Sequence, residues 1–337
     1  MYEAFYNLST KPFSLSPDPR FFFGSSVHKR AMSYLRYGIS QGEGFIVITG
    51  GIGTGKTTLV RNLFAELDKQ RIIAAQLVST NLTPDELIKM VSSAYGLPYE
   101  GLSKASLLKQ LETFLRRAEF QDKRVLLVVD EAQNLPAETV EELRMLSNFQ
   151  GENRSLIQSF LLGQDEFRHT IQSPGMEQLR QRIIASCHLN PLDKDEARSY
   201  IEHRLKEVGW SSRPVITDIA FELIHKHTGG VPRRINVFCD RLLLYGYLEE
   251  LFVFNPKVIT LVADELAAES EVPEAVVEAA RKKETMAQSH LQFHQAPAPQ
   301  APDISKNIKH IEMVINSLEK NMQDKIQLLR ESVSLLK

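Results

Sequence analysis

The sequence predicts an α/β fold in which a parallel five-stranded β-sheet lies between helices, followed by a smaller helical domain. Apolar runs of strand length alternate with helical stretches as far as residue 190, which is the pattern of a parallel sheet with helices on both faces. From residue 193 to about 268 the pattern becomes wholly helical. The expected strands are 44–50, 72–78, 125–130, 156–162 and 183–189.

A glycine-rich stretch between the first expected strand and a helix carries the clearest chemical signal. Residues Gly50 to Thr58 read GGIGTGKTT and fit the phosphate-binding pattern G-x-x-x-x-G-K-[ST] of P-loop nucleoside triphosphatases. The glycines let backbone N–H groups face phosphate oxygens, Lys56 adds a cation, and the Thr57 hydroxyl suits Mg²⁺. Because a strand and a helix flank the loop as the motif requires, a turn without a ligand is the weaker interpretation. The predicted nucleotide contacts are Gly50, Gly51, Ile52, Gly53, Thr54, Gly55, Lys56, Thr57 and Thr58.

A second motif ends the third expected strand. Residues 124–131 read RVLLVVDE, an apolar run typical of a strand buried on both faces, and end in Asp130 and Glu131. In ATPases with this loop the first acid holds Mg²⁺ through water, and the second orients the attacking water. We therefore assign Mg²⁺ to Thr57 and Asp130, and catalysis to Glu131 and Lys56. The alternative is a strand that ends in solvated acids; the spacing from Lys56, which fits an intervening strand and helices, disfavours it.

The bulk composition limits the class of protein. The 337 residues carry a formal net charge of −2, which gives no general attraction to nucleic acid or acidic membranes. The two cysteines, Cys187 and Cys239, fit a reducing cytoplasm and argue against a disulfide framework or a zinc site. No apolar run reaches the roughly 18 residues of a transmembrane helix, and the N-terminus lacks the shape of a signal peptide. We expect a cytoplasmic protein.

The chain divides into expected segments by composition. Residues 1–43 form an aromatic- and proline-rich segment with an extended path and a helix around 28–39, 44–190 form the nucleotide-binding core, and 191–268 form a helical lid. Residues 269–303 are rich in Ala, Glu and Pro and read as a flexible linker, and 304–337 carry an apolar heptad seam. Because such a seam must be buried, a coiled coil or a helix docked on a partner is favoured over a helix that folds back on the ATPase.

Further clusters resemble those of AAA+ ATPases, which hydrolyse ATP between neighbours in a ring. The sequence LRQRI before the fifth strand offers Arg182 or Arg180 to a neighbour's γ-phosphate, the alternative being a solvated basic turn. The sequence GGVPRRIN at 229–236 resembles the family's second sensor, which implies that Arg233 contacts the phosphates from the lid; the alternative is a helix start with solvated arginines. Gln164 stands where the first sensor would hold the attacking water, and a polar strand end is an equal alternative.

In order, the motifs over residues 1–268 resemble the ExeA/GspA-type secretion ATPases: FYNLSTKPFSLSPDPRFFF, the glycine loop, VVDEAQNL, FLLGQDEF, LRQRI and GGVPRRIN. Within that group the chain looks most like the PEP-CTERM system-associated ATPase, which is encoded with exosortase and exopolysaccharide loci. The resemblance implies that the N-terminal aromatic segment packs near the base, at Phe5, Phe13 and Pro19, with core packing as an equal alternative. Members that assemble secretins have a transmembrane helix and a peptidoglycan-binding domain where this sequence has the linker and heptad helix.

These observations predict an oligomeric enzyme that binds ATP and Mg²⁺ and hydrolyses ATP. The resemblance implies that it powers or switches an envelope export or exopolysaccharide machine, engaging a membrane partner through its last helix, in the cytoplasm or at the inner membrane. The alternative is a nucleotide-dependent DNA-binding scaffold like the transposition ATPases, although one short basic cluster, residues 281–283, and a negative net charge disfavour nucleic acid. A third option is a nucleotide-gated interaction module with slow turnover.

Overall fold

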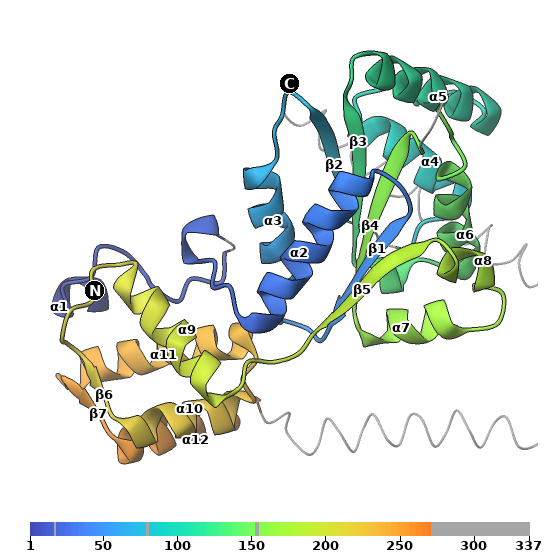
Figure 1. Ribbon diagram of the computed structural model, residues 1–337. Coiled ribbons are helices and arrows are strands. Elements are labelled where there is room, and N and C mark those ends of the chain that lie inside the picture. The colour runs from blue at the N-terminus through green and yellow to red at the C-terminus, as the bar shows by residue number, and fades with distance from the viewer. Residues whose placement is uncertain (17, 79–80, 152–154, 271–337) are drawn as a thin grey trace, which may run out of the picture. The chain divides into compact units, whose positions relative to one another are not determined.

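The computed structural model describes residues 1–16, 18–78, 81–151 and 155–270 (Figure 1). Residues 269 and 270 of the predicted linker over 269–303 belong to the last described helix, Pro256–Ser270. The rest of that linker and the predicted heptad helix over 304–337 lie outside the described residues, so both stay predictions. Among the helices that the structure describes, none has both the length and the apolar content needed to cross a membrane.

A parallel five-stranded sheet forms the centre, as the sequence predicts. Its order is β2-β3-β4-β1-β5, and every neighbouring pair runs parallel. Strand β1 therefore lies between β4 and β5, and the chain after β1 crosses to β2 at the far edge of the sheet. Ligands of such folds bind at the carboxyl end of the strand where the chain makes this crossover. The strands are β1 (Phe45–Gly50), β2 (Ile72–Val78), β3 (Arg124–Asp130), β4 (Ile157–Gly163) and β5 (Ile183–Leu189).

Helices cover both faces of this sheet (Figure 1). Successive strand residues point to opposite faces, so Ile46 and Ile48 pack under α2 (Ser26–Gln41) and α3 (Lys56–Glu66) in one apolar cluster. Phe45 and Val47 belong to a second cluster on the other face. The helices of that second face are α4 (Pro84–Ala94), α5 (Lys104–Phe120), α6 (Ala137–Leu146), α7 (Asp165–Gln172) and α8 (Glu177–Arg180), with the short 3-10 helix η2 (Ala132–Asn134) after β3.

The chain beyond β5 forms what we call the helical part, which has its own apolar cluster. The prediction that this stretch is wholly helical is wrong in one respect, because β6 (Val215–Ile216) and β7 (Val253–Phe254) form a two-stranded parallel pair. The short extended segments before two helices pair here, and this pairing buries the Phe254 side chain completely. The helices are α9 (Lys194–Lys206), α10 (Asp218–Thr228), α11 (Pro232–Leu248) and α12 (Pro256–Ser270).

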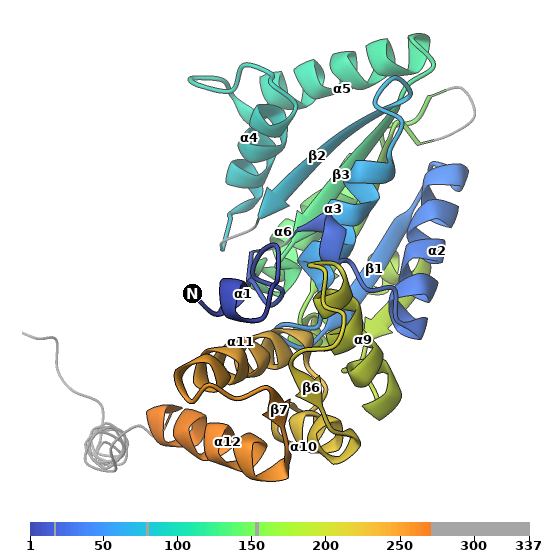
Figure 2. The same cartoon turned by 90° about the vertical axis from the view of Figure 1, so that its left-hand side faces the viewer.

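The N-terminal segment packs against the helical part before it reaches the sheet (Figure 2). It contains α1 (Tyr2–Phe5) and the 3-10 helix η1 (Pro19–Phe21), so its path is less extended than its prolines suggest. The Tyr2 hydroxyl donates to Asp240 Oδ1 at 2.5 Å, and the Tyr6 hydroxyl donates to the Leu251 carbonyl at 2.9 Å. These bonds fix the segment on α11 and on the turn that follows it.

Candidate functional site

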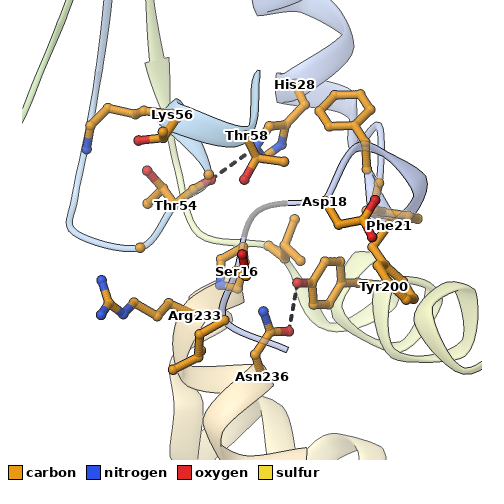
Figure 3. A pocket seen from close by; sticks show the side chains of 18 of the residues that line it. Ser16, Asp18, Phe21, His28, Thr54, Lys56, Thr58, Tyr200, Arg233 and Asn236 are labelled. Atoms are coloured by element: carbon orange, nitrogen blue, oxygen red, sulfur yellow. Dashed lines mark hydrogen bonds between the residues drawn. The ribbon is translucent and has the colours of Figure 1, made fainter. Parts of the chain in front are cut away.

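A cavity of about 360 Å³ joins the glycine loop to the helical part and the N-terminal segment (Figure 3). Most of the predicted site residues meet there, although they come from distant parts of the sequence. Gly50, Gly51 and Asp130 do not line the cavity but contact residues that do. The carbonyls of Gly50 and Gly51 accept from Lys56, and the Asp130 carboxylate accepts from Thr57. The predicted residues that line the cavity are Ile52, Gly53, Thr54, Gly55, Lys56, Thr57, Thr58, Glu131, Gln164 and Arg233.

The glycine loop follows β1 and ends where α3 begins at Lys56. Gly53 has φ 82° and Gly55 has φ 99°, in the left-handed region that residues with a Cβ rarely adopt. A Cβ on Gly55 would also stand 2.9 Å from the ring of His28. The glycines therefore permit both the backbone turn and the close approach of a neighbouring side chain.

The Lys56 ammonium lies folded onto its own loop. Its Nζ donates to the Gly50 carbonyl at 2.7 Å and to the Gly51 carbonyl at 3.1 Å, and the residue is 7% exposed. Burial lowers the pKa of Lys56, and the charges of Glu131 and Asp130 oppose that shift. A buried cation that is held by neutral carbonyls is well placed to turn toward an anion that enters the loop.

Asp130 ends β3 and is almost fully buried. Its Oδ2 accepts a hydrogen bond from the Thr57 hydroxyl at 3.1 Å, and its Oδ1 accepts from the Glu131 backbone N–H at 3.0 Å. Burial raises the pKa of Asp130 above its ordinary value, although both hydrogen bonds lower it. The two motifs predicted to hold Mg²⁺ are thus in direct contact.

Glu131 follows in the left-handed conformation, with φ 55°. This turn directs its carboxylate to two amides: Oε2 accepts from Gln133 Nε2 at 2.6 Å and from Gln164 Nε2 at 3.2 Å. Burial raises the pKa of Glu131, but the two amides and Lys56 outweigh burial and bring it below its usual value. Gln133 was not predicted as a site residue; its place two positions after Glu131, in the turn η2, was the only signal.

His28 is the second site residue that the sequence analysis missed. Its ring is buried on α2, with Nδ1 2.7 Å from the Ser25 hydroxyl and Nε2 3.0 Å from the Thr54 carbonyl (Figure 3). Nε2 must donate to that carbonyl, and in the neutral ring, which burial favours, Nδ1 accepts from the Ser25 hydroxyl. Burial lowers the pKa of His28. The ring thereby ties the glycine loop to the first turn of α2.

Arg233 brings the helical part against the loop, and the phosphate contact that the resemblance to a second sensor implies stays a prediction. Its backbone N–H donates to the Gly53 carbonyl at 3.2 Å, and a Cβ on Gly53 would lie only 2.6 Å from the Arg233 Cβ. The side chain is exposed and lines the cavity. The start of α11 therefore touches the loop through its backbone and leaves the guanidinium available to the cavity.

The N-terminal segment lines the cavity, but not through the residues named from the sequence. Phe13 is 2% exposed within the core of the helical part, and Phe5 stacks on Phe252 with ring centroids 4.7 Å apart. At Phe5 and Phe13 the structure therefore shows core packing, which was the alternative to a contact with the base. The segment lines the cavity with residues 14–16, 18 and 21–23 instead.

Neither candidate for the arginine finger lines this cavity. Arg180 donates to the carbonyls of Ile171, at 2.7 Å, and Ser173, at 3.0 Å, which closes the end of α7. Arg182 donates to the Ser147 hydroxyl and to Asn148 Oδ1, both at 2.5 Å, at the end of α6. A role in hydrolysis for either arginine requires the nucleotide of a neighbouring copy.

His28→Ala should weaken ATP binding about tenfold at neutral pH, because the Thr54 carbonyl would lose its donor and the loop its attachment to α2. His225→Ala is the matched control, since His225 Nε2 bonds the Leu192 carbonyl at 3.0 Å and does not line the cavity. Calorimetric titration with ATP measures the affinities. Equal losses in the two variants would contradict the assignment of His28 to the loop.

The comparisons with known proteins find an AAA domain in the part of the chain that carries the glycine loop. A family model described as an AAA domain matches residues 39–171. General secretion pathway protein A of Aeromonas hydrophila is 37% identical over 248 residues, which cover 73% of this chain and 45% of that protein. The chain thus spans about half the length of this curated relative.

Two solved structures from archaeal proteins have a similar fold. The ORC2 protein of Aeropyrum pernix, solved as ADPNP–ADP complexes, aligns with a TM-score of 0.59 at 18% identity, over 80% of this chain and 74% of that chain. Cdc6p of Pyrobaculum aerophilum aligns with a TM-score of 0.58 at 17% identity, over 75% of this chain and 70% of that chain. At such identities the likeness shows the fold alone. Together with the matched AAA domain, it gives the fold of P-loop proteins of the AAA type, and the chain is similar to general secretion pathway protein A over 248 residues.

Proposed function

We propose that the cavity binds ATP with Mg²⁺, with the triphosphate on the glycine loop, and that hydrolysis moves the helical part relative to the sheet. The observation that carries this proposal is that one cavity collects the loop, Glu131, Gln164 and Arg233. Lys56 and the loop N–H groups would hold the phosphates. Glu131, with Gln164 beside it, would align the attacking water.

The residues around Thr57 fit Mg²⁺. Its hydroxyl and the Asp130 carboxylate are hard oxygen donors already in contact, 3.1 Å apart, and Mg²⁺ in phosphoryl-transfer sites takes one or two protein oxygens together with phosphate and water. The described residues contain no cluster of three His, Cys, Asp or Glu side chains that could hold a metal by themselves, in keeping with a metal that arrives with the nucleotide. The ion would neutralise charge on the phosphates; Thr57 and Asp130 would fix where it sits.

The link between nucleotide and motion runs through Arg233. Because its backbone N–H bonds the Gly53 carbonyl and its guanidinium is exposed to the cavity, this one residue contacts the loop and can also bind a phosphate. Loss of the γ-phosphate would remove the guanidinium's partner and release α11. The differential contact with ATP and ADP is what a nucleotide switch requires.

Arg182 is our candidate for a finger that completes a neighbour's site. Arg180 donates to two backbone carbonyls and so stabilises the local fold. Arg182 donates to the Ser147 hydroxyl and the Asn148 amide oxygen, two side-chain groups that water can serve in its place. We expect turnover per chain to rise with protein concentration, and Arg182→Ala to lower turnover about 10³-fold at saturating concentration while ATP binding persists. Arg180→Ala should instead lower the melting temperature. Turnover that stays flat with concentration would exclude a shared site.

The similarity to general secretion pathway protein A supports a proposal for the process served. We propose an envelope export machine and, more specifically, an exopolysaccharide system of the exosortase type, with the segment 304–337 docking on an inner-membrane partner. The test measures ATPase turnover of the full chain with inner-membrane vesicles and, separately, with double-stranded DNA. Stimulation by vesicles alone supports the proposal, and stimulation by DNA alone would favour the DNA-binding scaffold.

A further inference from the structure

Three buried polar side chains that line the cavity form a directed chain, and Figure 3 shows two of them, Tyr200 and Asn236, joined by a hydrogen bond. Arg204 Nη1 donates to the Tyr200 hydroxyl at 2.8 Å, and that hydroxyl donates to Asn236 Oδ1 at 2.8 Å. Arg204, Tyr200 and Asn236 are 5%, 6% and 7% exposed, and all three line the cavity. A polar chain this deeply buried is held in one arrangement.

The direction of the chain fixes the Asn236 amide. An arginine can only donate, so the Tyr200 oxygen accepts from Arg204 and its own proton goes to Asn236. The Asn236 oxygen must therefore face Tyr200, and the amide nitrogen points away from it, toward the segment that carries Ser16 (Figure 3). The group that Asn236 presents to the cavity is a hydrogen-bond donor.

Arg204 is held at its other end by the N-terminal segment. Its Nε donates to the Pro12 carbonyl at 2.6 Å and its Nη2 donates to the Ser14 carbonyl at 3.2 Å. The guanidinium also lies 4.8 Å from the centre of the Phe21 ring. Backbone and aromatic contacts thus prevent the guanidinium from turning, and the Tyr200 hydroxyl cannot reverse its role.

The apolar part of the cavity lining suits a flat, largely apolar ring. Leu15, Phe21, Phe22 and Phe23 line the same cavity. Aromatic and aliphatic walls with one oriented polar group are typical of sites for heteroaromatic ligands. A purine offers unprotonated ring nitrogens on its edges, and these accept hydrogen bonds from an amide N–H.

We propose that Asn236 selects the base of the bound nucleotide, through a hydrogen bond from its amide nitrogen to a ring nitrogen of a purine. Tyr200 and Arg204 are positioning residues that fix the direction of that amide. The inference rests on the proposed function, since it assumes that the triphosphate lies on the glycine loop. It adds the chemical class of the base and the residue that recognises it.

The test is calorimetric binding of the full-length chain to a set of probes: ATP, CTP, inorganic tripolyphosphate, and the 1-deaza, 3-deaza and 7-deaza analogues of ATP. Each deaza analogue replaces one ring nitrogen by C–H, so only the analogue that lacks the contacted nitrogen leaves the Asn236 donor without an acceptor. Wild-type protein should bind one analogue about 10- to 100-fold more weakly than ATP. Asn236→Leu should bind ATP with a similar loss and should no longer distinguish that analogue from ATP.

Tyr200→Phe tests the positioning role. It keeps the ring but releases the amide to flip, so discrimination among the analogues should shrink while tripolyphosphate binding stays unchanged. A residue with a merely structural role would weaken all probes together.

The failures are distinguishable. If wild-type protein binds tripolyphosphate but binds ATP, CTP and all three analogues equally, the inference about Asn236 is overturned while the phosphate site stands. If tripolyphosphate does not bind at all, the proposed function falls, and the inference with it. The analogue series on the wild-type protein needs no variant, so a misfolded Asn236→Leu would not leave the question open.

Discussion

Lys56→Ala should abolish measurable ATP binding while the protein stays folded. Charged hydrogen bonds contribute about 1.5–3 kcal/mol each, so losing contacts to two phosphates predicts binding weaker by at least about 100-fold. The amine has no competing acid within the loop: it is held by the Gly50 and Gly51 carbonyls, which release it to an incoming triphosphate. Titration of a fluorescent ATP analogue against the variant measures the loss.

The stability of the Lys56→Ala protein separates lost binding from lost fold. Burial lowers the pKa of Lys56, so the charged amine binds its proton less tightly in the folded chain than in the unfolded one, and the ammonium is unfavourable for folding at neutral pH. Alanine removes that charge, and we expect the melting temperature without nucleotide to hold or rise. The increase that ATP gives the wild type should vanish. Lys69→Ala, which removes an exposed cation just after α3, should retain both binding and the increase.

If Lys56→Ala bound ATP within threefold of the wild type, the triphosphate would lie elsewhere than on the glycine loop. A large drop in its melting temperature would instead mean that Lys56 holds the loop together. Circular dichroism at 25 °C decides whether the variant is folded when binding is measured.

The central sheet could be predicted from the sequence because a parallel strand buried on both faces appears as a continuous run of apolar residues. The run Val125 to Val129 is uniformly apolar, and the structure buries every residue of it. The glycine loop was equally visible, since its backbone needs glycine at Gly53 and Gly55. Such features follow from local chemistry and leave few alternatives.

His28 and Gln133 could not be found in this way, because their roles depend on contacts between distant elements. His28 reaches Thr54, 26 positions later in the chain, only after α2 has packed on the sheet. Gln133 accepts from the backbone N–H of Gln164, 31 positions later in the chain, from a turn that follows the left-handed residue Glu131. An isolated histidine carries no sequence signal for such an arrangement, and for Gln133 the only signal is its place two positions after Glu131.

The aromatic N-terminal segment shows the converse limit. Its aromatic composition indicates burial but does not say whether a side chain packs only in the core or also lines the cavity. Phe13 and Phe21 show these two outcomes. Both are buried in the same cluster, yet only Phe21 also lines the cavity. Which aromatic faces a ligand depends on the path of the backbone, here set by the Arg204 bonds to the Pro12 and Ser14 carbonyls.

Glu131→Gln should bind ATP as tightly as the wild type or more tightly, yet hydrolyse it about 10²- to 10⁴-fold more slowly. The amide keeps an oxygen that can accept from Gln133 and Gln164, so the local structure is preserved. The substitution removes the negative charge that polarises the attacking water, so hydrolysis slows. It also removes the repulsion between that charge and the γ-phosphate, so binding of ATP is kept or strengthened. Single-turnover hydrolysis of radiolabelled ATP, with binding measured separately, resolves the two effects.

Glu166→Gln is the matched control for that variant. Glu166 also acts on the charge of Lys56, but it is exposed on α7 and does not line the cavity. Neutralising it should therefore leave turnover within about threefold of the wild type, as is usual for an exposed surface charge. Normal hydrolysis by Glu131→Gln would show that another group activates the water. Equal slowing in both variants would show that hydrolysis depends on the total negative charge of the site. A specific role in positioning water is expected of Glu131, which accepts from Gln133 and Gln164, and not of Glu166.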